Sequence, residues 1–131
     1  PNTPGLRDLQ HGESLSQLLT RLKQEQGKLE QKYQRYVPLA VKIAPDLQID
    51  EIQDIAKRLI AAGIDAVIAT NTTNSRPASL RCVNLADEVG GLSGLPVFEL
   101  STDVLKTLVK ALDGHIPVIA AGGISTAQQA Q

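Results

Sequence analysis

Residues 37–45 read VPLAVKIAP, a short apolar run that predicts a β-strand with two unlike faces. Successive side chains of a strand point to opposite faces, so Leu39, Val41 and Ile43 share one face. The other face carries small residues and one cation, Lys42. This asymmetry suits a barrel strand, whose large side chains pack against outer helices while its small ones line the interior near a ligand.

Helical patterns and further apolar runs alternate along the rest of the chain. Buried strands are predicted at residues 65–71 and 116–121, which read DAVIATN and IPVIAA. Apolar residues spaced three, four and seven positions apart predict amphipathic helices at residues 13–36, 50–62 and 102–112. Helices that alternate with near-continuous apolar strands predict an α/β fold with a parallel sheet.

Three residues are predicted to mark helix ends. Gly63 follows the second helix, where a left-handed cap is expected. Ser101 is predicted to cap the third helix, and Ser125 a fourth helix that runs to the end of the chain. A doubly wound sheet and a βα barrel share this local order of elements. The chemistry at the strand ends therefore has to distinguish them.

Composition narrows the class of protein. The 131 residues match the size of one ordinary domain, and the 13 basic and 14 acidic residues nearly cancel. No net field therefore favours nucleic acid or an anionic membrane. The single cysteine, Cys82, has no partner for an internal disulfide, which fits a reducing compartment. His11 and His115 lie outside any metal-ligand spacing, so we expect no zinc site.

The start of the chain suggests a piece of a longer protein. It opens on Pro1 and contains no methionine, and no signal or transit peptide explains that start. Aromatic residues make up only 2% of the sequence, whereas a self-sufficient core of this size usually holds several large rings. We therefore expect a fragment.

Two strand ends carry side chains that suit a polar ligand. Lys42 lies among small residues on a face that points away from the helices, where a charge needs an anionic partner. The run Thr70-Asn71-Thr72 ends the strand at 65–71, and barrel ligands bind at the carboxyl ends of strands. The alternatives are a lysine that extends to solvent and a polar turn that closes the strand.

Two glycine runs have a similar position. Gly122-Gly123 follows the strand at 116–121, and its N–H groups are able to hold a phosphate or to form a simple strand-to-helix turn. The run at 90–94, GGLSG, is either a flexible loop or a close backbone approach to a planar ligand.

Five motifs, taken together, indicate a family. They read PNTPGLR at 1–7, VKIAP at 41–45, ATNTT at 69–73, GGLSG at 90–94 and AGGI at 121–124. In this order and spacing they resemble dihydroorotate dehydrogenase, in particular its quinone-linked, membrane-associated class. The resemblance implies a (βα)8 TIM barrel. Residues 1–131 would then be a fragment of a single FMN-binding barrel domain, from just after strand four to the start of helix seven.

The resemblance also implies an activity. Such enzymes oxidise dihydroorotate to orotate in pyrimidine (UMP) biosynthesis, with FMN as cofactor and a quinone as electron acceptor. Asn2, Asn71 and Thr72 match substrate-binding positions of the family. Matches to FMN-binding positions are Lys42, Thr70, Gly94 and Gly123. The class implies a peripheral membrane protein on the cytoplasmic side of the inner membrane, held by an amino-terminal region outside these residues.

One catalytic group falls outside the chain. The family's base immediately precedes the Pro of the Pro-Asn motif, and this chain starts at Pro1. Serine there marks the quinone-linked class and cysteine the soluble class, so our assignment to the quinone-linked class rests on the TPGLR run at 3–7. The alternatives are a soluble-class enzyme that uses fumarate or a nicotinamide, and a flavin-free phosphate-binding barrel. The isolated 131 residues are expected to be inactive.

Overall fold

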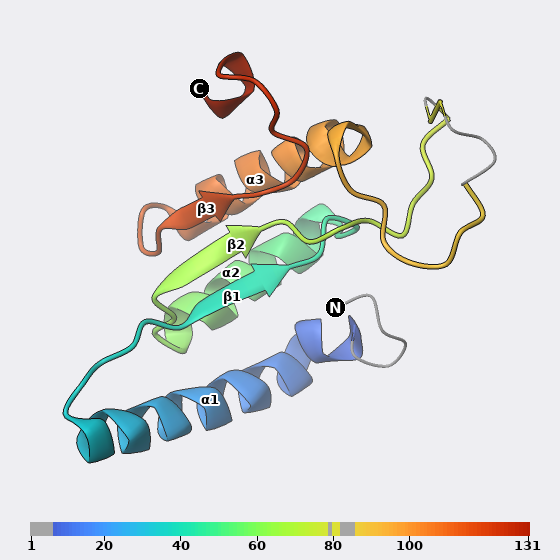
Figure 1. The fold of residues 1–131 in the computed structure, drawn as a ribbon. Helices are drawn as coiled ribbons and strands as arrows, with labels where there is room; N and C mark the ends of the chain where they lie inside the picture. Colours follow the sequence, from blue (N-terminus) through green and yellow to red (C-terminus); the bar gives the residue numbers. More distant parts are fainter. Residues whose placement is uncertain (1–6, 79, 82–85) are drawn as a thin grey trace.

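The structure is a computed structural model that describes residues 7–78, 80–81 and 86–131 (Figure 1). Its sheet contains the strands β1 (Ala40–Ile43), β2 (Ala66–Ala69) and β3 (Val118–Ala120) in the order β1-β2-β3. Both neighbouring pairs are parallel. The α/β prediction is therefore confirmed. Cys82 and Asn2 lie outside the described residues.

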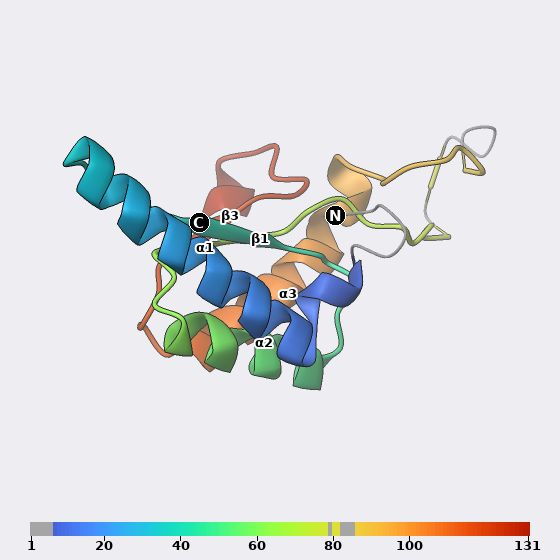
Figure 2. The same cartoon turned by 90° about the horizontal axis from the view of Figure 1, so that it is seen from below.

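Three helices cover one face of this sheet. They are α1 (Gly12–Tyr33), α2 (Ile49–Ala61) and α3 (Phe98–Leu112). Figure 2 shows α2 and α3 on the same side of the strands, whereas α1 starts on that side and its carboxyl end rises past the level of the strands. Helices α2 and α3 are the crossovers between successive strands. Parallel strands joined by helices in this way form successive βαβ units.

The alternation predicted for residues 37–45 separates the core from an open face. On the helix side, Val41 aligns with Val67 and Val118, and Val67 is fully buried. The opposite row aligns Lys42 with Ile68 and Ile119, and Ile119 is 51% exposed. The core between sheet and helices is built mainly from aliphatic side chains, namely Leu15, Leu19, Ile43, Ile52, Ile55, Leu59, Val67, Val104, Leu108 and Leu112. Burial of each such side chain contributes about 1.5–3 kcal/mol.

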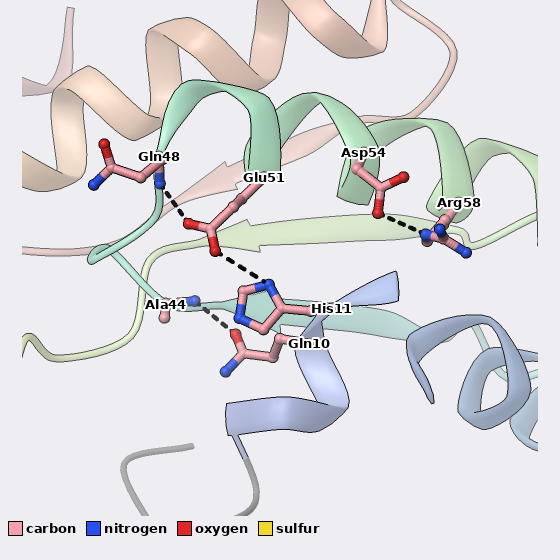
Figure 3. A network of polar contacts seen from close by, with 7 residues as sticks. All are labelled: Gln10, His11, Ala44, Gln48, Glu51, Asp54 and Arg58. Atoms are coloured by element: carbon pink, nitrogen blue, oxygen red, sulfur yellow. Dashed lines mark hydrogen bonds and ion pairs between the residues drawn. The ribbon is translucent and has the colours of Figure 1, made fainter. Parts of the chain in front are cut away.

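The carboxyl end of helix α2 is the one that the sequence predicted, and its amino end has a cap that the sequence analysis did not identify. Gly63 has φ +65°, the left-handed conformation expected after a helix. At the other end the Gln48 N–H donates to the Glu51 carboxylate over 2.7 Å, as part of a capping box (Figure 3). Arg58, near the carboxyl end, donates to Asp54 over 2.7 Å and to Ser16 of α1 over 2.6 Å. The hydrogen bond from Arg58 holds the pKa of Asp54 below its ordinary value.

Two predicted caps are wrong. Helix α3 begins at Phe98, so Ser101 lies inside it rather than at its N-cap. The helix starts earlier because the 3-10 turn Leu95–Val97, with Pro96 in its first turn, leads directly into it. Near the carboxyl end the described structure has only the 3-10 turn Gln128–Ala130, whose N-cap is Ala127, so Ser125 does not cap it; the contacts just before the turn are made by Thr126. Its hydroxyl accepts from the Gln129 N–H over 3.2 Å, and the Gln129 side chain accepts from the Thr126 N–H over 3.1 Å.

The amino end of β2 is joined to the end of α1 by Asp65. Its carboxylate accepts hydrogen bonds from the Leu39 N–H over 2.8 Å, the Gln26 amide over 3.2 Å and the Tyr36 hydroxyl. These bonds, with Leu39 the strongest, hold the pKa of Asp65 below its ordinary value. Among the described helices, none is long and apolar enough to cross a membrane.

Candidate active site

The predicted site residues of the three strands meet at one edge of the sheet. Lys42 is the next-to-last residue of β1, and Thr70 and Asn71 follow β2 directly. The backbone ladder continues there: the Asn71 N–H donates to the Ile43 oxygen over 2.8 Å, and the Thr70 N–H to the Ala121 oxygen over 2.5 Å. These bonds bring the ends of β1, β2 and β3 together, as the parallel order predicts.

Lys42 lies on the open face of the sheet. Its row contains Ile68 and Ile119, and the helices cover the opposite face, as the sequence predicted. The side chain is exposed, and within the described part of the chain it has no ion pair or hydrogen bond. A cation on a largely apolar open face can serve as a partner for an anionic or electron-rich ligand.

The run after β2 divides into two parts. Thr70 is 3% exposed and donates to the Asn71 oxygen over 2.9 Å, whereas Asn71 and Thr72 are partly exposed. Thr73 is 1% exposed, and its hydroxyl donates to Asp46, which also accepts from the Asn74 N–H over 3.3 Å. The polar cluster therefore serves two purposes, because its second half anchors the loop to the end of β1.

The sequence prediction overlooked Asp46. It stands directly after Pro45, where β1 has just ended, and also accepts from the Ser75 hydroxyl over 3.0 Å. The sequence does place this carboxylate directly after the predicted strand at 37–45, which could have marked it as a candidate. Its partners lie 27 to 29 residues further along the chain and were not visible in the sequence.

The two predicted glycines, Gly94 and Gly123, are in close contact. A Cβ atom on Gly123 would lie 2.6 Å from the Gly94 oxygen and 2.8 Å from the Phe98 nitrogen. Both glycines have positive φ, +76° and +71°. Tight packing of main chain against main chain therefore already requires glycine at position 123, apart from any ligand.

The turn after β3 leaves amide groups available. Within the described residues, the N–H groups of Gly122, Gly123 and Ile124 donate to no acceptor, and all three residues are at least partly exposed. The Gly122 oxygen accepts from the buried Ser101 hydroxyl over 2.9 Å, which fixes the turn against α3. Successive free amides at the end of a strand are a suitable site for a phosphate group. The residues present therefore fit a phosphate-bearing cofactor, and Lys42, on β1 of the same sheet, adds a positive charge.

The segment before α1 reaches the same end of the sheet. Gln10 is 8% exposed, and its side-chain oxygen accepts from the Ala44 N–H over 3.0 Å, just beyond β1 (Figure 3). His11 lies 3.5 Å from the Glu51 carboxylate, where it joins this segment to α2. Asn2, the remaining predicted substrate residue, lies outside the described residues.

A cavity of about 330 Å³ lies beside the end of β3. Its walls include Ala69, Phe98, Ser101, Ala121 and Ile124. Lys42, Asn71 and Thr72 do not line it. These three predicted ligand residues therefore lie outside this cavity. Within the described part of the chain, no three His, Cys, Asp or Glu side chains gather as a metal ion would require.

Comparison with known proteins gives a consistent family. A family model described as dihydroorotate dehydrogenase matches residues 1–131. The chain is 54% identical over its full length to a dihydroorotate dehydrogenase (quinone) of Aeromonas salmonicida, and 53% identical to one of Saccharophagus degradans. It spans 39% and 38% of the length of these two relatives.

Solved structures agree with this result. A structure of DHODH from Eimeria tenella in complex with ferulenol matches 99% of this chain with a TM-score of 0.90 and 40% sequence identity. The match covers 38% of the Eimeria chain. A ligand-free DHODH structure from the same organism has a TM-score of 0.87 over 98% of this chain. The expectation of a partial barrel is confirmed by these matches.

Proposed function

Because the chain belongs to the dihydroorotate dehydrogenase family, we propose that it forms part of the flavin and substrate site of a longer enzyme. That enzyme oxidises dihydroorotate to orotate and passes the electrons to a quinone. The observation that carries the proposal is the convergence of Lys42, the Thr70–Thr72 run and the free Gly122–Ile124 amides at one edge of a parallel sheet. We call the longer protein that carries residues 1–131 the full-length enzyme.

The residues of this chain divide into two groups. On the cofactor side, Lys42 supplies positive charge to the flavin ring, Thr70, Gly94 and Gly123 line its pocket, and the amides after β3 donate to its phosphate. FMN supplies the hydride acceptor when it is bound. On the substrate side, Asn2, Asn71 and Thr72 donate and accept hydrogen bonds at the polar edge of the pyrimidine, which orients the reacting carbon atoms.

Proton removal belongs to a residue outside the chain in this proposal. A base that precedes Pro1 in the full-length enzyme takes the proton from one ring carbon. Hydride leaves the adjacent carbon. The relatives named dihydroorotate dehydrogenase (quinone) support a quinone as the acceptor. Contact with the cytoplasmic side of the inner membrane is assigned to a region outside the 131 residues.

The first test is made on the purified full-length enzyme. We expect it to carry one FMN per chain and to form orotate from dihydroorotate, faster with a soluble quinone than with fumarate or NAD. A folded protein without flavin would overturn the proposal. Bound FMN with fumarate as the preferred acceptor would keep the flavin site and overturn the quinone assignment.

A second test isolates the contribution of this chain. Residues 1–131 replace the matched segment of the Aeromonas salmonicida relative, which is 54% identical to them. We expect the chimera to bind FMN and to form orotate, with the unmodified relative as the control. A chimera that melts like the relative and yet binds no FMN would show that these residues do not build the proposed site.

A further inference from the structure

Among the described residues of the loop that follows β2, Arg76 makes five hydrogen bonds to main-chain oxygens. This loop, residues 70–94, leaves the sheet and returns to the start of α3 (Figure 1). Its two limbs are joined at the base, where the Thr73 N–H donates to the Leu92 oxygen over 3.0 Å and the Leu92 N–H to the Thr73 oxygen over 2.7 Å. Arg76 lies just beyond this bridge.

The guanidinium group of Arg76 uses its whole set of donors on backbone oxygens. Its Nε donates to Ala86 over 2.7 Å, and its Nη2 donates to Glu88 over 2.8 Å and to Gly90 over 2.9 Å. Its Nη1 donates more weakly, to Asn74 over 3.4 Å and to Ser75 over 3.3 Å. Arginine has five N–H groups, one on Nε and two on each Nη, and each finds an acceptor here.

The outgoing limb is fixed from the other side by Asp46. This carboxylate, just after β1, accepts from Thr73, Asn74 and Ser75. Arg76 then connects the outgoing limb to Ala86, Glu88 and Gly90 of the returning limb. A continuous set of bonds therefore runs from the end of β1 to the segment that ends at Gly94, whose oxygen packs against Gly123.

We propose that Arg76 is a positioning residue for the substrate side of this site. Asn71 and Thr72 lie on the outgoing limb next to the Thr73–Leu92 bridge, and Gly94 ends the returning limb. Arg76 holds the two limbs at a set separation and so fixes Asn71 and Thr72 relative to Gly94. This inference rests on the proposed function for the roles of Asn71, Thr72 and Gly94. The bonds of Arg76 do not depend on it.

Substitution of Arg76 by lysine tests whether its planar set of donors, and not only its charge, holds the two limbs together. Arg76→Lys keeps the positive charge and most of the chain length, but an ammonium group has three donors at a single point and does not reproduce the planar fork. Arg76→Ala removes the contacts altogether. The matched control is Arg81→Lys, because Arg81 belongs to the same loop, is exposed and has no hydrogen bond to another described residue.

The experiment uses the full-length enzyme and two independent readouts. Backbone amide exchange at Thr73 and Leu92 reports the bridge, and we expect Arg76→Lys to accelerate it at least about tenfold. The KM for dihydroorotate should rise about 10- to 100-fold in Arg76→Lys, since small displacements of positioning groups have effects of that size. The kcat per bound flavin should fall less than KM rises, because substrate contacts are lost in ground state and transition state alike.

Each other outcome has a distinct meaning. Unchanged exchange at Thr73 and Leu92 would overturn the inference, whatever the activity. Faster exchange with KM within twofold of the wild type would show that Arg76 serves the loop alone, which also overturns it. A wild-type enzyme that neither binds FMN nor oxidises dihydroorotate would instead overturn the proposed function. Arg81→Lys should leave exchange, KM and kcat at wild-type values.

Discussion

At the level of single side chains, Lys42 tests the proposed flavin site most directly. It is an exposed cation on the open face of the sheet, and no described residue neutralises it. Replacement by alanine should lower FMN retention and reduce turnover about 100-fold, because a fixed charge beside a cofactor contributes on that scale. Flavin content by absorbance and orotate formation in the full-length enzyme measure the two effects. Lys110→Ala, on the exposed surface of α3, is the control. Full flavin content and rate in Lys42→Ala would contradict the role given to Lys42.

Replacing either of two glycines by alanine should change the free energy of unfolding, in opposite directions. Gly123→Ala places a methyl group 2.6 Å from the Gly94 oxygen at φ +71°. We expect it to lower the free energy of unfolding by about 2–4 kcal/mol, from overpacking and left-handed strain together. Gly27, inside α1, has nothing within 4 Å of its added Cβ, so Gly27→Ala should raise that free energy by about 0.5–1 kcal/mol. Urea unfolding of the full-length enzyme measures both. Equal effects of the two substitutions would show that the predicted clash at Gly123 relaxes.

Single residues were predictable from sequence where their role is local. Gly63 follows a helix, and its positive φ needs only that neighbour. Arg76 and Asp46 escaped prediction because most of their partners are main-chain groups and hydroxyls 10 to 29 residues away, and the sequence does not show such pairings. For Gly123 the sequence pointed to glycine for one reason only, although the structure shows a second. A family motif assigned it to a cofactor, while its contact with Gly94 supplies an independent reason for glycine that only packing reveals.

At the scale of elements, Asp65 joins α1 and the 34–39 connection to β2. Its pKa lies below the ordinary value of 3.8 because the Leu39 N–H, and then the Tyr36 hydroxyl, donate to its carboxylate. A carboxyl group with a lowered folded pKa stabilises the fold above its unfolded value, and that stabilisation is lost as pH falls through the folded value. Asp65→Asn should therefore cost about 1–3 kcal/mol at neutral pH. The difference from wild type should shrink below pH 3.8.

Urea unfolding of the full-length enzyme across the acid range measures this difference. Glu30→Gln is the control, since Glu30 is exposed on α1 and has no partner among the described residues. It should leave the unfolding curve unchanged at every pH. A constant gap between Asp65→Asn and wild type down to the acid limit would mean that the Asp65 contacts do not depend on its charge.

The elements themselves differ in how far the sequence predicts them. The strand at 37–45 and helix α2 follow from alternation and helical spacing, because each buries one face against a neighbour. The predicted start of α3 was wrong by several residues. Serine is a common N-cap residue, so Ser101 was predicted to be the cap, whereas the helix begins at Phe98. The Ser101 hydroxyl lies 2.9 Å from the Phe98 oxygen, three residues back in the helix, and also 2.9 Å from the Gly122 oxygen, 21 positions away, so it joins α3 to the turn after β3. Local preference yields to packing there.

At the scale of the whole molecule, the described structure leaves large surfaces uncovered. The order β1-β2-β3 gives β1 and β3 one free edge each among the described strands. Ile119 on the open face is 51% exposed, and Leu29 on α1 is 52% exposed. In a closed barrel, neighbouring strands pair with both edges and the open face becomes the interior. Unpaired edges and uncovered apolar faces promote association.

We therefore predict that the isolated 131 residues do not form an independent FMN-binding unit. They should associate in sedimentation experiments, bind a hydrophobic dye and melt without a sharp transition, because the three-stranded sheet alone lacks its barrel neighbours. The full-length enzyme, with those neighbours present, should melt cooperatively and retain FMN under the same conditions. The comparison distinguishes two possibilities for the open face of the sheet. Either it stays exposed in the folded protein, or the rest of the barrel covers it. A fragment that is monomeric, melts sharply and binds FMN would contradict this prediction. It would show that the three-stranded sheet and its three helices are enough to bind the cofactor.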